Sequence, residues 1–448
     1  EGIMKTRVLI CGGVRTPIGH LGKTLAAVQP EDLLTHAIKG LLAQYSLDPA
    51  AIDGLIMGWV GQGSHAPNIA RIAGLLSGIP ETATAYTVQS NCVSGMESIA
   101  SAVRAIQLDE GEVFIAGGTE SMSSFPYAIR GARSQKPLRN MNALKANWQT
   151  LWDDKEVAII DCIEEGLTDQ VKHINMAETA EVCAQRYGIT RTMQDDYAAE
   201  TFRRCFAAEE NGFYGSHVIP FSANGVSLER DEYVYARKAL VEDASMFTKA
   251  PVLFQTTDHP FSKFYDDFGA FIPERKYHAG ETEPTVTLFN SCARSDAAAA
   301  VIVASESAAV RLGLPVLAEV LSYATAGVNP AYMGIAPAHA APIALKRAGV
   351  SFDAVTNIEL HEAFAATVLS AFAESKKEFG CDWEALWRDG RLNPHGGSIP
   401  LGHPLAATGT RLVLSLIYAM MENKDSKFGL AAACASGGIG GAMVIARP

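Results

Sequence analysis

The chain has 448 residues, of which 48% are hydrophobic and 19% charged, so it can build two or three domains with large buried cores. Its formal net charge of -12 argues against a nucleic-acid partner, because binding phosphate backbones requires a concentrated cationic surface. The 8 cysteines have no regular spacing and form no CxxC pair. This pattern indicates neither a disulfide framework nor a zinc site, and it favours reduced thiols.

Strand and helix patterns alternate through the first part of the chain. The apolar run at 7–13 predicts a strand, 30–45 a helix and 52–60 a second strand. After Cys92, apolar residues recur at helical spacing as far as Ile106, and 112–118 predicts a further short strand. This alternation predicts an α/β layer structure in which helices cover the sheet.

The second half of the chain repeats this order. Strands are predicted at 316–327 and 355–360 and helices at 341–349 and 403–421, and 428–446 is predicted to form paired strands. The last segment carries no charge for 19 residues, but its five glycines fit buried strands better than a membrane helix. We therefore expect two similar halves, 4–123 with 284–312 and 313–448, with an inserted loop domain at 124–283 that covers the cleft between them.

The N-terminal residues carry no secretory-signal pattern, since no long apolar core with a small-residue cleavage site precedes the first strand. We expect the protein to stay in the cytoplasm, or in an organelle matrix if the source is eukaryotic.

Two stretches resemble known motifs but lack a residue that the motif requires. Gly22, Lys23 and Thr24 imitate the end of a phosphate-binding loop, but Pro17 stands where that loop needs glycine, and proline has no N–H to donate. "HEAFA" at His361 resembles a zinc-protease helix, but Ala365 occupies the place of the second histidine. We therefore expect neither a nucleotide loop nor a metal site.

Four side chains remain that can do acid, base or nucleophilic work: Cys92, His361, His403 and Cys434. Taken singly, each is more often a structural residue. Cys92 and His403, however, both fall where a helix begins after a strand, in corresponding places of the two repeats, and Cys434 and His361 fall at strand ends. If a pseudo-twofold axis relates the halves, the four side chains meet in one pocket.

Such a pocket would suit acyl transfer, which needs at least a nucleophile with an adjacent base. A helix start and a nearby imidazole both favour the thiolate form of Cys92, so we expect its pKa to be lowered. The glycines around 396–402 and 437–441 allow backbone N–H groups to approach a developing oxyanion.

Five ordered stretches resemble the thiolase family, and the likeness runs nearly end to end. They are "NCVSGMESIASA", "AGGTESMS", "TVTLFNSCARSDAAAAVIVAS", "GHPLAATGTR" and "CASGGIGGAM". "HEAFA", in which many thiolases have asparagine first, and "NPHGGSIPLGHP" are most similar to the thiolase subunit of the fatty-acid β-oxidation trifunctional complex. The resemblance implies a thiolase-like fold with a layered αβαβα core and an inserted loop domain.

The resemblance also implies a reaction, the CoA-dependent cleavage of 3-oxoacyl-CoA to acetyl-CoA and a shortened acyl-CoA, or the reverse Claisen condensation. Cys92 would be the acylated nucleophile, His403 its base, and Cys434 the acid and base at the acetyl carbon. His403 and a group positioned by His361 would polarise the thioester carbonyl. The backbone N–H groups that hold the other oxyanion would come from Cys92, Ser436, Gly437 and Gly438.

The implied ligands are CoA and acyl-CoA as substrates, with no permanently bound cofactor. The inserted domain would bind CoA, with contacts from Met176, Arg237, Phe364 and Cys292, the last standing where a serine often touches the pantetheine arm. Arg130, Arg133, Lys172 and Arg237 would meet the CoA phosphates, or form a solvated face. Residues 255–283 form a longer segment than is usual at this place in the family.

The implied partners are a second copy in a homodimer or homotetramer, or a hydratase/dehydrogenase subunit of a β-oxidation complex.

Two other functions are compatible with parts of this pattern. A decarboxylating ketoacyl synthase of the same broad fold also pairs a cysteine with histidines, but it lacks a terminal acid/base cysteine such as Cys434. A non-catalytic acyl-CoA carrier would have kept the fold and lost the reaction, and the four intact side chains argue against it.

Overall fold

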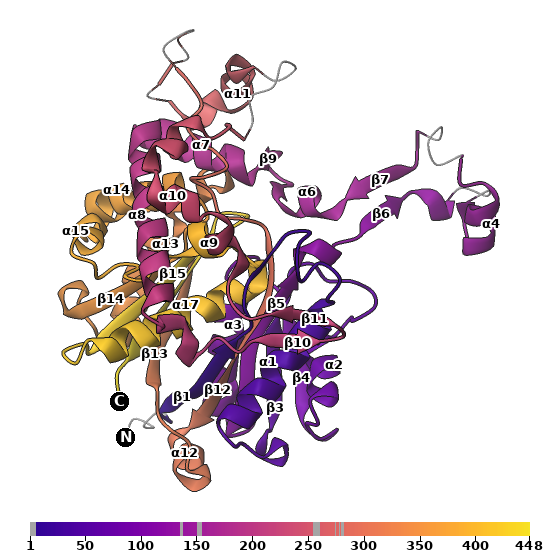
Figure 1. The fold of residues 1–448 in the computed structure, drawn as a ribbon, viewed down its shortest axis with the longest axis vertical. Helices are drawn as coiled ribbons and strands as arrows, with labels where there is room; N and C mark the ends of the chain where they lie inside the picture. Colours follow the sequence, from indigo (N-terminus) through magenta and orange to yellow (C-terminus); the bar gives the residue numbers. More distant parts are fainter. Residues whose placement is uncertain are drawn as a thin grey trace.

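One ten-stranded sheet organises the molecule in the computed structural model, which describes residues 6–134, 138–149, 155–253, 260–273, 275–276, 278 and 282–448. The strand order is β14 (Val355–Leu360), β15 (Phe428–Ala435), β16 (Ile439–Ala446), β13 (Ala318–Gly327), β1 (Val8–Arg15), β12 (Ser295–Ser305), β5 (Val113–Ser121), β3 (Gly54–Gly58) and β4 (Thr84–Val88), with the short β2 (Gly19–His20) beside β12. The N-terminal half supplies one side of this order and the C-terminal half the other (Figure 1).

The two halves of the sheet have the same pattern of pairing. β3 lies parallel to β5, which is antiparallel to β12, which is antiparallel to β1. In the second half β14, β15, β16 and β13 repeat this pattern in the same directions. The halves join through a short antiparallel contact in which Leu9 faces Glu319 and Ile10 faces Ala318. The predicted duplication of the βαβ-rich unit is therefore present in the fold.

Helices form three layers: one on the outer face of each half of the sheet, and one between the two halves. α1 (Pro30–Gln44) and α2 (Ile69–Leu76) cover the outer face of the N-terminal half, and α13 (Ala336–Ala348) covers that of the C-terminal half, beside α14 (Ala365–Phe379). α3 (Ser94–Gln107) and α17 (Leu405–Glu422) pack against each other between the halves. Three apolar cores fill the spaces between these layers, which gives the predicted αβαβα arrangement.

The two central helices approach each other at glycines. A Cβ on Gly95 of α3 would lie 2.4 Å from the carbonyl oxygen of Ala406, and one on Gly409 of α17 would lie 2.5 Å from the backbone nitrogen of Met96. No side chain fits at these distances, so both positions require glycine. The contact brings the N-terminal ends of α3 and α17 together, and Cys92 and His403 lie immediately before those ends.

One expectation about this region is wrong. The sequence predicts that His403 begins a helix directly after a strand, as Cys92 does after β4. In the second half the counterpart of β4 is reduced to a single parallel bridge between Ile358 and Leu392, and the short α16 (Ser398–Leu401) precedes His403. His403 still corresponds to Cys92, because each lies immediately before its central helix.

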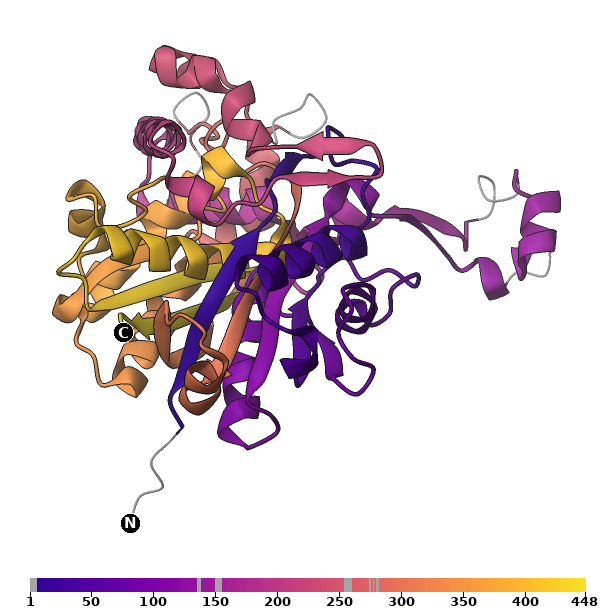
Figure 2. The ribbon, with the colours of Figure 1, turned by 60° about the horizontal axis from the view of Figure 1, so that its bottom comes forward.

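The segment between β5 and β12 stands apart from the layers. β6 (Tyr127–Arg130) and β7 (Ala158–Asp161) form a two-stranded arm that carries α4 (Met141–Ala146) away from the body of the molecule (Figures 1 and 2). The rest of the segment includes α6 (Cys162–Gly166), β8 (Thr168–Asp169), β9 (Ile174–Asn175), α7 (Met176–Tyr187), α8 (Arg191–Glu210), β10 (Phe221–Ala223), β11 (Val226–Leu228), α9 (Glu232–Ala236), α10 (Lys238–Glu242) and α11 (Phe261–Phe268). Ten of the 29 residues of the predicted 255–283 extension, 255–259, 274, 277 and 279–281, lie outside the described residues.

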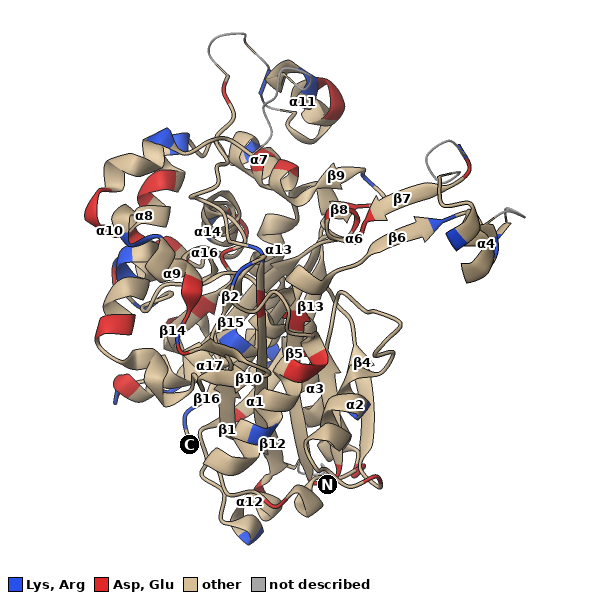
Figure 3. Cartoon of the chain, turned by 45° about the vertical axis from the view of Figure 1, so that its right-hand side comes forward, with Lys and Arg blue, Asp and Glu red and all other residues tan. Residues whose placement is uncertain are grey.

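Charged residues lie mainly on the peripheral helices, and the central strands carry few (Figure 3). The charge-free stretch at 428–446 forms the paired strands β15 and β16, as predicted, and both are buried over most of their length. Among the described residues, no helix has both the length and the apolar character needed to cross a membrane.

Candidate active site

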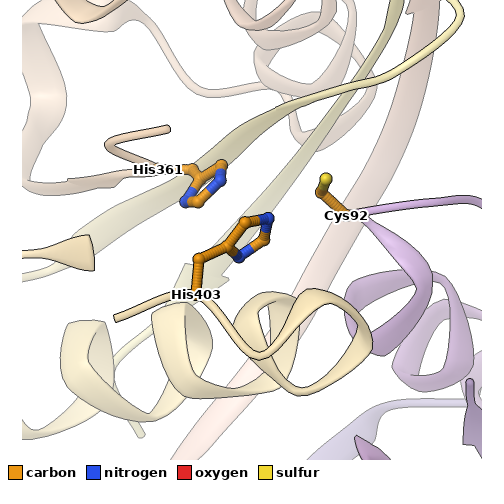
Figure 4. A group of neighbouring side chains, drawn as sticks. All are labelled: Cys92, His361 and His403. Carbon is orange, nitrogen blue, oxygen red and sulfur yellow. The ribbon is translucent and has the colours of Figure 1, made fainter. Parts of the chain in front are cut away.

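The fold brings the four singled-out side chains to one place. Cys92 lies between β4 and α3, His361 follows β14 directly, His403 precedes α17, and Cys434 is near the end of β15. The sulfur of Cys92 and one ring nitrogen of each histidine all lie within 4.8 Å of one another, and the two imidazole centroids are 4.2 Å apart (Figure 4). The backbone N–H of His361 donates to the carbonyl of Ala432, two residues before Cys434.

A cavity of about 420 Å³ opens onto this group. Cys92, His403 and Cys434 line it, whereas His361 is not among the lining residues and lies buried against His403. Most of the remaining lining is apolar and comes from both halves and from the inserted segment: Leu21, Met122, Leu167, Met176, Leu253, Leu288, Met333, Phe364 and Leu405. Such a cavity suits a ligand with a long apolar body and a reactive carbonyl at its inner end.

Hydrogen bonds to backbone carbonyls hold the loops of the two halves in register around the cavity. The Asn91 side chain donates to the carbonyl of Ser436 at 2.9 Å, and Asn91 itself has a left-handed φ of 49°. The N–H of His403 donates to Ala293, and that of Cys292 to Ala363. Segments far apart in the chain are thereby tied directly to one another beside the nucleophile candidate.

The turn after β15 has the geometry expected of an anion-binding backbone. Ser436 lines the cavity, and Gly437 and Gly438 follow with φ values of 81° and 73°. The backbone N–H groups of Ser436 and of Cys92 approach the Cys92 sulfur closely enough to lower its pKa. N–H groups in this position can stabilise negative charge on a ligand atom bound there.

The expected lowering of the Cys92 pKa is wrong. Burial raises the pKa of Cys92 to about 12, and this effect outweighs the two backbone N–H groups that lower it. The cause is desolvation, because a thiolate in a largely apolar cavity loses the hydration that stabilises its charge. Cys92 therefore rests as a thiol and needs a base at the moment of attack.

Both histidines are poised to be neutral. Burial, with a smaller contribution from the nearby Arg411 guanidinium, lowers the pKa of His403 to about 3. Burial, His403 and Arg411 together hold the pKa of His361 well below its usual value. Each Nδ1 has a hydroxyl partner, at 2.8 Å from Ser398 for His361 and 2.7 Å from Thr408 for His403. Each Nε2 is buried and has no hydrogen-bond partner among the described residues, so it is available to a ligand.

Cys434 is a protonated thiol at neutral pH. Burial raises its pKa well above the usual value, and the neighbouring thiols of Cys92, Cys183 and Cys292 raise it further. Met176, Phe364 and Cys434 belong to one apolar cluster at the wall of the cavity. A buried thiol at this place can donate a proton to a carbanion that forms beside it.

The arrangement is not a favourable resident metal site. Cys92, His361 and His403 are the one set of potential ligands close enough to share an ion among the described residues. The buried guanidinium of Arg411, however, disfavours positive charge at both imidazoles. The thiol and the imidazoles are better placed to exchange protons with one another.

The comparisons with known proteins give the family. The model described as "Thiolase, N-terminal domain" matches residues 8–246, and "Thiolase, C-terminal domain" matches 314–447. The chain belongs to the thiolase family. It is 34% identical to an acetyl-CoA acetyltransferase of Pseudomonas aeruginosa over 98% of this chain and 99% of the relative, and 35% identical to one of Escherichia coli K12 over 99% and 100%.

Solved thiolase structures agree over the whole length. The crystal structure of human mitochondrial 3-ketoacyl-CoA thiolase in complex with CoA has a TM-score of 0.82 at 30% identity, covering 99% of this chain and 98% of that chain. A Bacillus anthracis acetyl-CoA acetyltransferase has the same TM-score at 31% identity, covering 99% of both chains. This thiolase is therefore an acyltransferase.

The residues predicted to contact CoA in this thiolase divide into two groups. Met176, Cys292 and Phe364 line the cavity. Arg237 does not; its guanidinium lies over the rings of Tyr233 and Phe289.

The other predicted phosphate contacts also lie off the cavity wall. Arg130 forms an ion pair with Glu165, Lys172 lies over the Phe271 ring, and Arg133 is exposed. The binding roles assigned to these cations remain predictions.

Sequence reasoning missed the residues behind the cavity. Ser398 and Arg411 form a hydrogen bond of 2.6 Å next to His361; both stand in stretches that resemble the family, "NPHGGSIPLGHP" and "GHPLAATGTR", but neither residue was singled out there. Glu362 is fully buried and accepts hydrogen bonds from Tyr197, Thr201, Asn393 and the Ile399 backbone. The one available signal was a glutamate inside an otherwise apolar segment, which implies several buried donors around it.

Proposed function

We propose that this thiolase cleaves a 3-oxoacyl-CoA with free CoA, releasing acetyl-CoA and an acyl-CoA shortened by two carbons, and that it also runs the reverse Claisen condensation. The observation that carries the proposal is the meeting of two thiols and two neutral imidazoles at the inner end of one apolar cavity. The names of the relatives support the same chemistry, since they describe acetyl-CoA acetyltransferases and a 3-ketoacyl-CoA thiolase.

In the first half-reaction the Cys92 thiol passes its proton to His403, and the sulfur attacks the 3-keto carbon. This transfer creates a thiolate beside an imidazolium, and their electrostatic attraction offsets part of the hydration energy that each charge loses by burial. The C2–C3 bond then breaks, its electron pair forms the enolate of acetyl-CoA, and Cys434 protonates that carbon. Acetyl-CoA leaves, and the acyl group remains as a thioester on Cys92.

In the second half-reaction free CoA attacks the acyl carbon. The Cys434 thiolate takes the CoA thiol proton, the bond to Cys92 breaks, and the Cys92 sulfur recovers its proton from His403. During both steps the N–H groups of Cys92, Ser436, Gly437 and Gly438 are proposed to hold one oxyanion, and His361 with His403 the thioester carbonyl. Each residue ends as it began, so the cycle needs no permanently bound cofactor.

The finer assignments are also proposals. The apolar lining from Leu21 to Leu405 supports a fatty acyl chain, and hence a role in fatty-acid β-oxidation. Met176, Cys292 and Phe364 are proposed to contact the pantetheine arm, and Arg237 the CoA phosphates. The inserted domain is assigned to 124–283, and the protein is proposed to assemble as a homodimer or homotetramer, with a hydratase/dehydrogenase subunit as a further partner.

An acetyl-CoA release assay separates the three candidate functions. We expect 3-oxoacyl-CoA to yield acetyl-CoA only when free CoA is added, at a rate that depends on chain length. A decarboxylating synthase would instead release carbon dioxide from a malonyl thioester, and a carrier would bind acyl-CoA without turnover. Absence of CoA-dependent cleavage across a series of chain lengths, in a protein that still binds CoA, would overturn the proposal.

A further inference from the structure

A buried hydrogen-bond chain reaches His361 from behind. Arg411 Nη2 donates to Ser398 Oγ at 2.6 Å, and Ser398 Oγ lies 2.8 Å from His361 Nδ1. All three residues are almost completely buried, with 2%, 0% and 1% of their surface exposed. Solvent therefore does not compete for these hydrogen bonds, and their donors and acceptors can be assigned one by one.

The assignment begins at the arginine. A guanidinium only donates, so Ser398 Oγ is the acceptor of that hydrogen bond. A hydroxyl has a single proton, and in the part of the chain that the structure describes His361 Nδ1 is the remaining partner of Ser398 Oγ. If Nδ1 carried the ring proton, the buried hydroxyl proton would have no acceptor, which is costly. The hydroxyl therefore donates to Nδ1, and the ring proton of neutral His361 resides on Nε2.

His403 has no such constraint. Its Nδ1 lies 2.7 Å from Thr408 Oγ1, and no guanidinium donates to that hydroxyl among the described residues. Thr408 Oγ1 has no second partner among the described residues, and its hydroxyl can rotate to donate to Nδ1 or to accept from it, so this hydrogen bond leaves both tautomers of His403 accessible. His361 is thus restricted to donating from Nε2, whereas His403 can accept a proton at Nε2.

We propose that Ser398 and Arg411 are positioning residues that fix His361 as the Nε2–H tautomer. In that form His361 only donates a hydrogen bond to the substrate thioester oxygen, and the task of taking the Cys92 proton falls to His403 alone. An asparagine, the commoner residue at this place in the family, also presents an N–H donor from its amide. The hydrogen bonds from Arg411 through Ser398 thus give His361 the same N–H donor role as that amide. This inference rests on the proposed thiolase reaction only for its catalytic consequence, because the tautomer itself can be observed without turnover.

The tautomer is tested by NMR on the full-length protein with 15N-labelled histidine. The His361 signals are assigned by their loss in His361→Asn, and proton coupling identifies which ring nitrogen carries hydrogen. We expect a protonated Nε2 and an unprotonated Nδ1 in the wild type, and a mixture of tautomers in Ser398→Ala. A protonated Nδ1 in the wild type would overturn the proposal, whether or not the protein has thiolase activity.

The catalytic consequence is tested by a double-mutant cycle. We expect Ser398→Ala to lower kcat by about tenfold or more with KM changed less than about twofold, and Ser398→Thr, which keeps the hydroxyl, to recover most of the loss. In the His361→Asn background no tautomer exists, so adding Ser398→Ala should change kcat by less than about twofold. Equal losses in both backgrounds, with folding verified by circular dichroism, would mean that Ser398 has a purely structural role.

Discussion

Cys92 is kept as a thiol by its surroundings, which makes its reactivity strongly dependent on pH. Because its pKa is raised to about 12, the thiolate fraction should rise about tenfold for each pH unit between 7 and 10. We therefore predict that the rate of alkylation of Cys92 by iodoacetamide, followed by peptide mass spectrometry, rises without a plateau across this range. A small-molecule thiol is the control, and a plateau near pH 7 for Cys92 would show a resting thiolate instead.

Glu359 makes the stability of the protein depend on pH. Its carboxyl group is buried 3.9 Å from Arg411 and has no hydrogen-bond partner in the part of the chain that the structure describes. Burial, with a smaller contribution from Glu362, raises its pKa from 4.5 to about 8 against the lowering effect of Arg411. As pH rises from about 4.5 to 8 the unfolded chain releases this proton while the folded protein keeps it, so stability is lost over that window.

We predict that Glu359→Gln removes this loss. Between pH 5 and 8 the free energy of unfolding of the wild type should fall by about 3 kcal/mol more than that of the variant. The measurement is urea denaturation of both proteins at one protein concentration. The buried histidines are common to both and cancel in the comparison, so identical pH dependence would contradict the raised pKa.

At the residue scale the sequence identified the reactive atoms but not their protonation states. The thiol of Cys92 and the imidazole of His403 were found because each lies before a predicted helix. Burial sets the direction of both pKa shifts, and Arg411 adds to the shift of His403; a helix-dipole argument includes neither effect. Glu362 contacts Tyr197 across 165 positions, and Ser398 contacts Arg411 across 13 positions and from one helix to the next, so no local pattern predicts either contact.

At the scale of elements, the α3–α17 contact sets the separation of Cys92 and His403. We predict that Gly95→Ala pushes the helices apart, because its Cβ would lie 2.4 Å from the Ala406 carbonyl oxygen. The expected result is a loss of about 2 to 4 kcal/mol in unfolding free energy and a large fall in kcat, measured by denaturation and by acetyl-CoA release.

The matched control for this change is Gly166→Ala, at a position where an added Cβ meets nothing within 4 Å. That variant should retain wild-type stability and kcat. If Gly95→Ala behaved like the control, the close approach of the two helices would not be needed to place the nucleophile beside its base.

Most elements could be predicted because their hydrophobic periods are strong. β1, α1, β13, α17 and the β15–β16 pair all lie where the alternation of apolar runs placed them. The arm formed by β6 and β7 was not foreseen. Its strands are four residues each and mostly exposed, with Tyr127 at 72% and Ile129 at 42%, so they carry no buried face and no clear alternation.

At the scale of the whole molecule, β4 is an edge strand with open hydrogen-bonding groups. Tyr86 on this strand is 46% exposed, and Leu75 and Leu76 of α2, which packs on β4, are 43% and 52% exposed. An exposed edge beside apolar side chains is a natural pairing surface, which is consistent with the proposed homo-oligomer.

We predict that sedimentation velocity finds a dimer or tetramer for the wild type, and that Tyr86→Glu shifts it toward monomer by placing a charge on that edge. Val310→Glu changes an equally apolar side chain, 78% exposed on α12 (Glu306–Leu312), and should leave the assembly unchanged. A wild type that sediments as a monomer would contradict the proposed assembly, and a Tyr86→Glu variant that keeps its oligomer would contradict the edge as its site.

The duplicated layers explain why residues more than three hundred positions apart share one cavity: each half contributes a nucleophile or base immediately before its own central helix. The most direct test of this account is to incubate the protein with acetyl-CoA in the absence of an acceptor, quench it in acid, and locate the acetyl group by peptide mass spectrometry. The account predicts acetylation of Cys92 alone, and none in Cys92→Ser. Acetylation of Cys434 or Cys292 with Cys92 left free, or equal labelling of the variant, would contradict it.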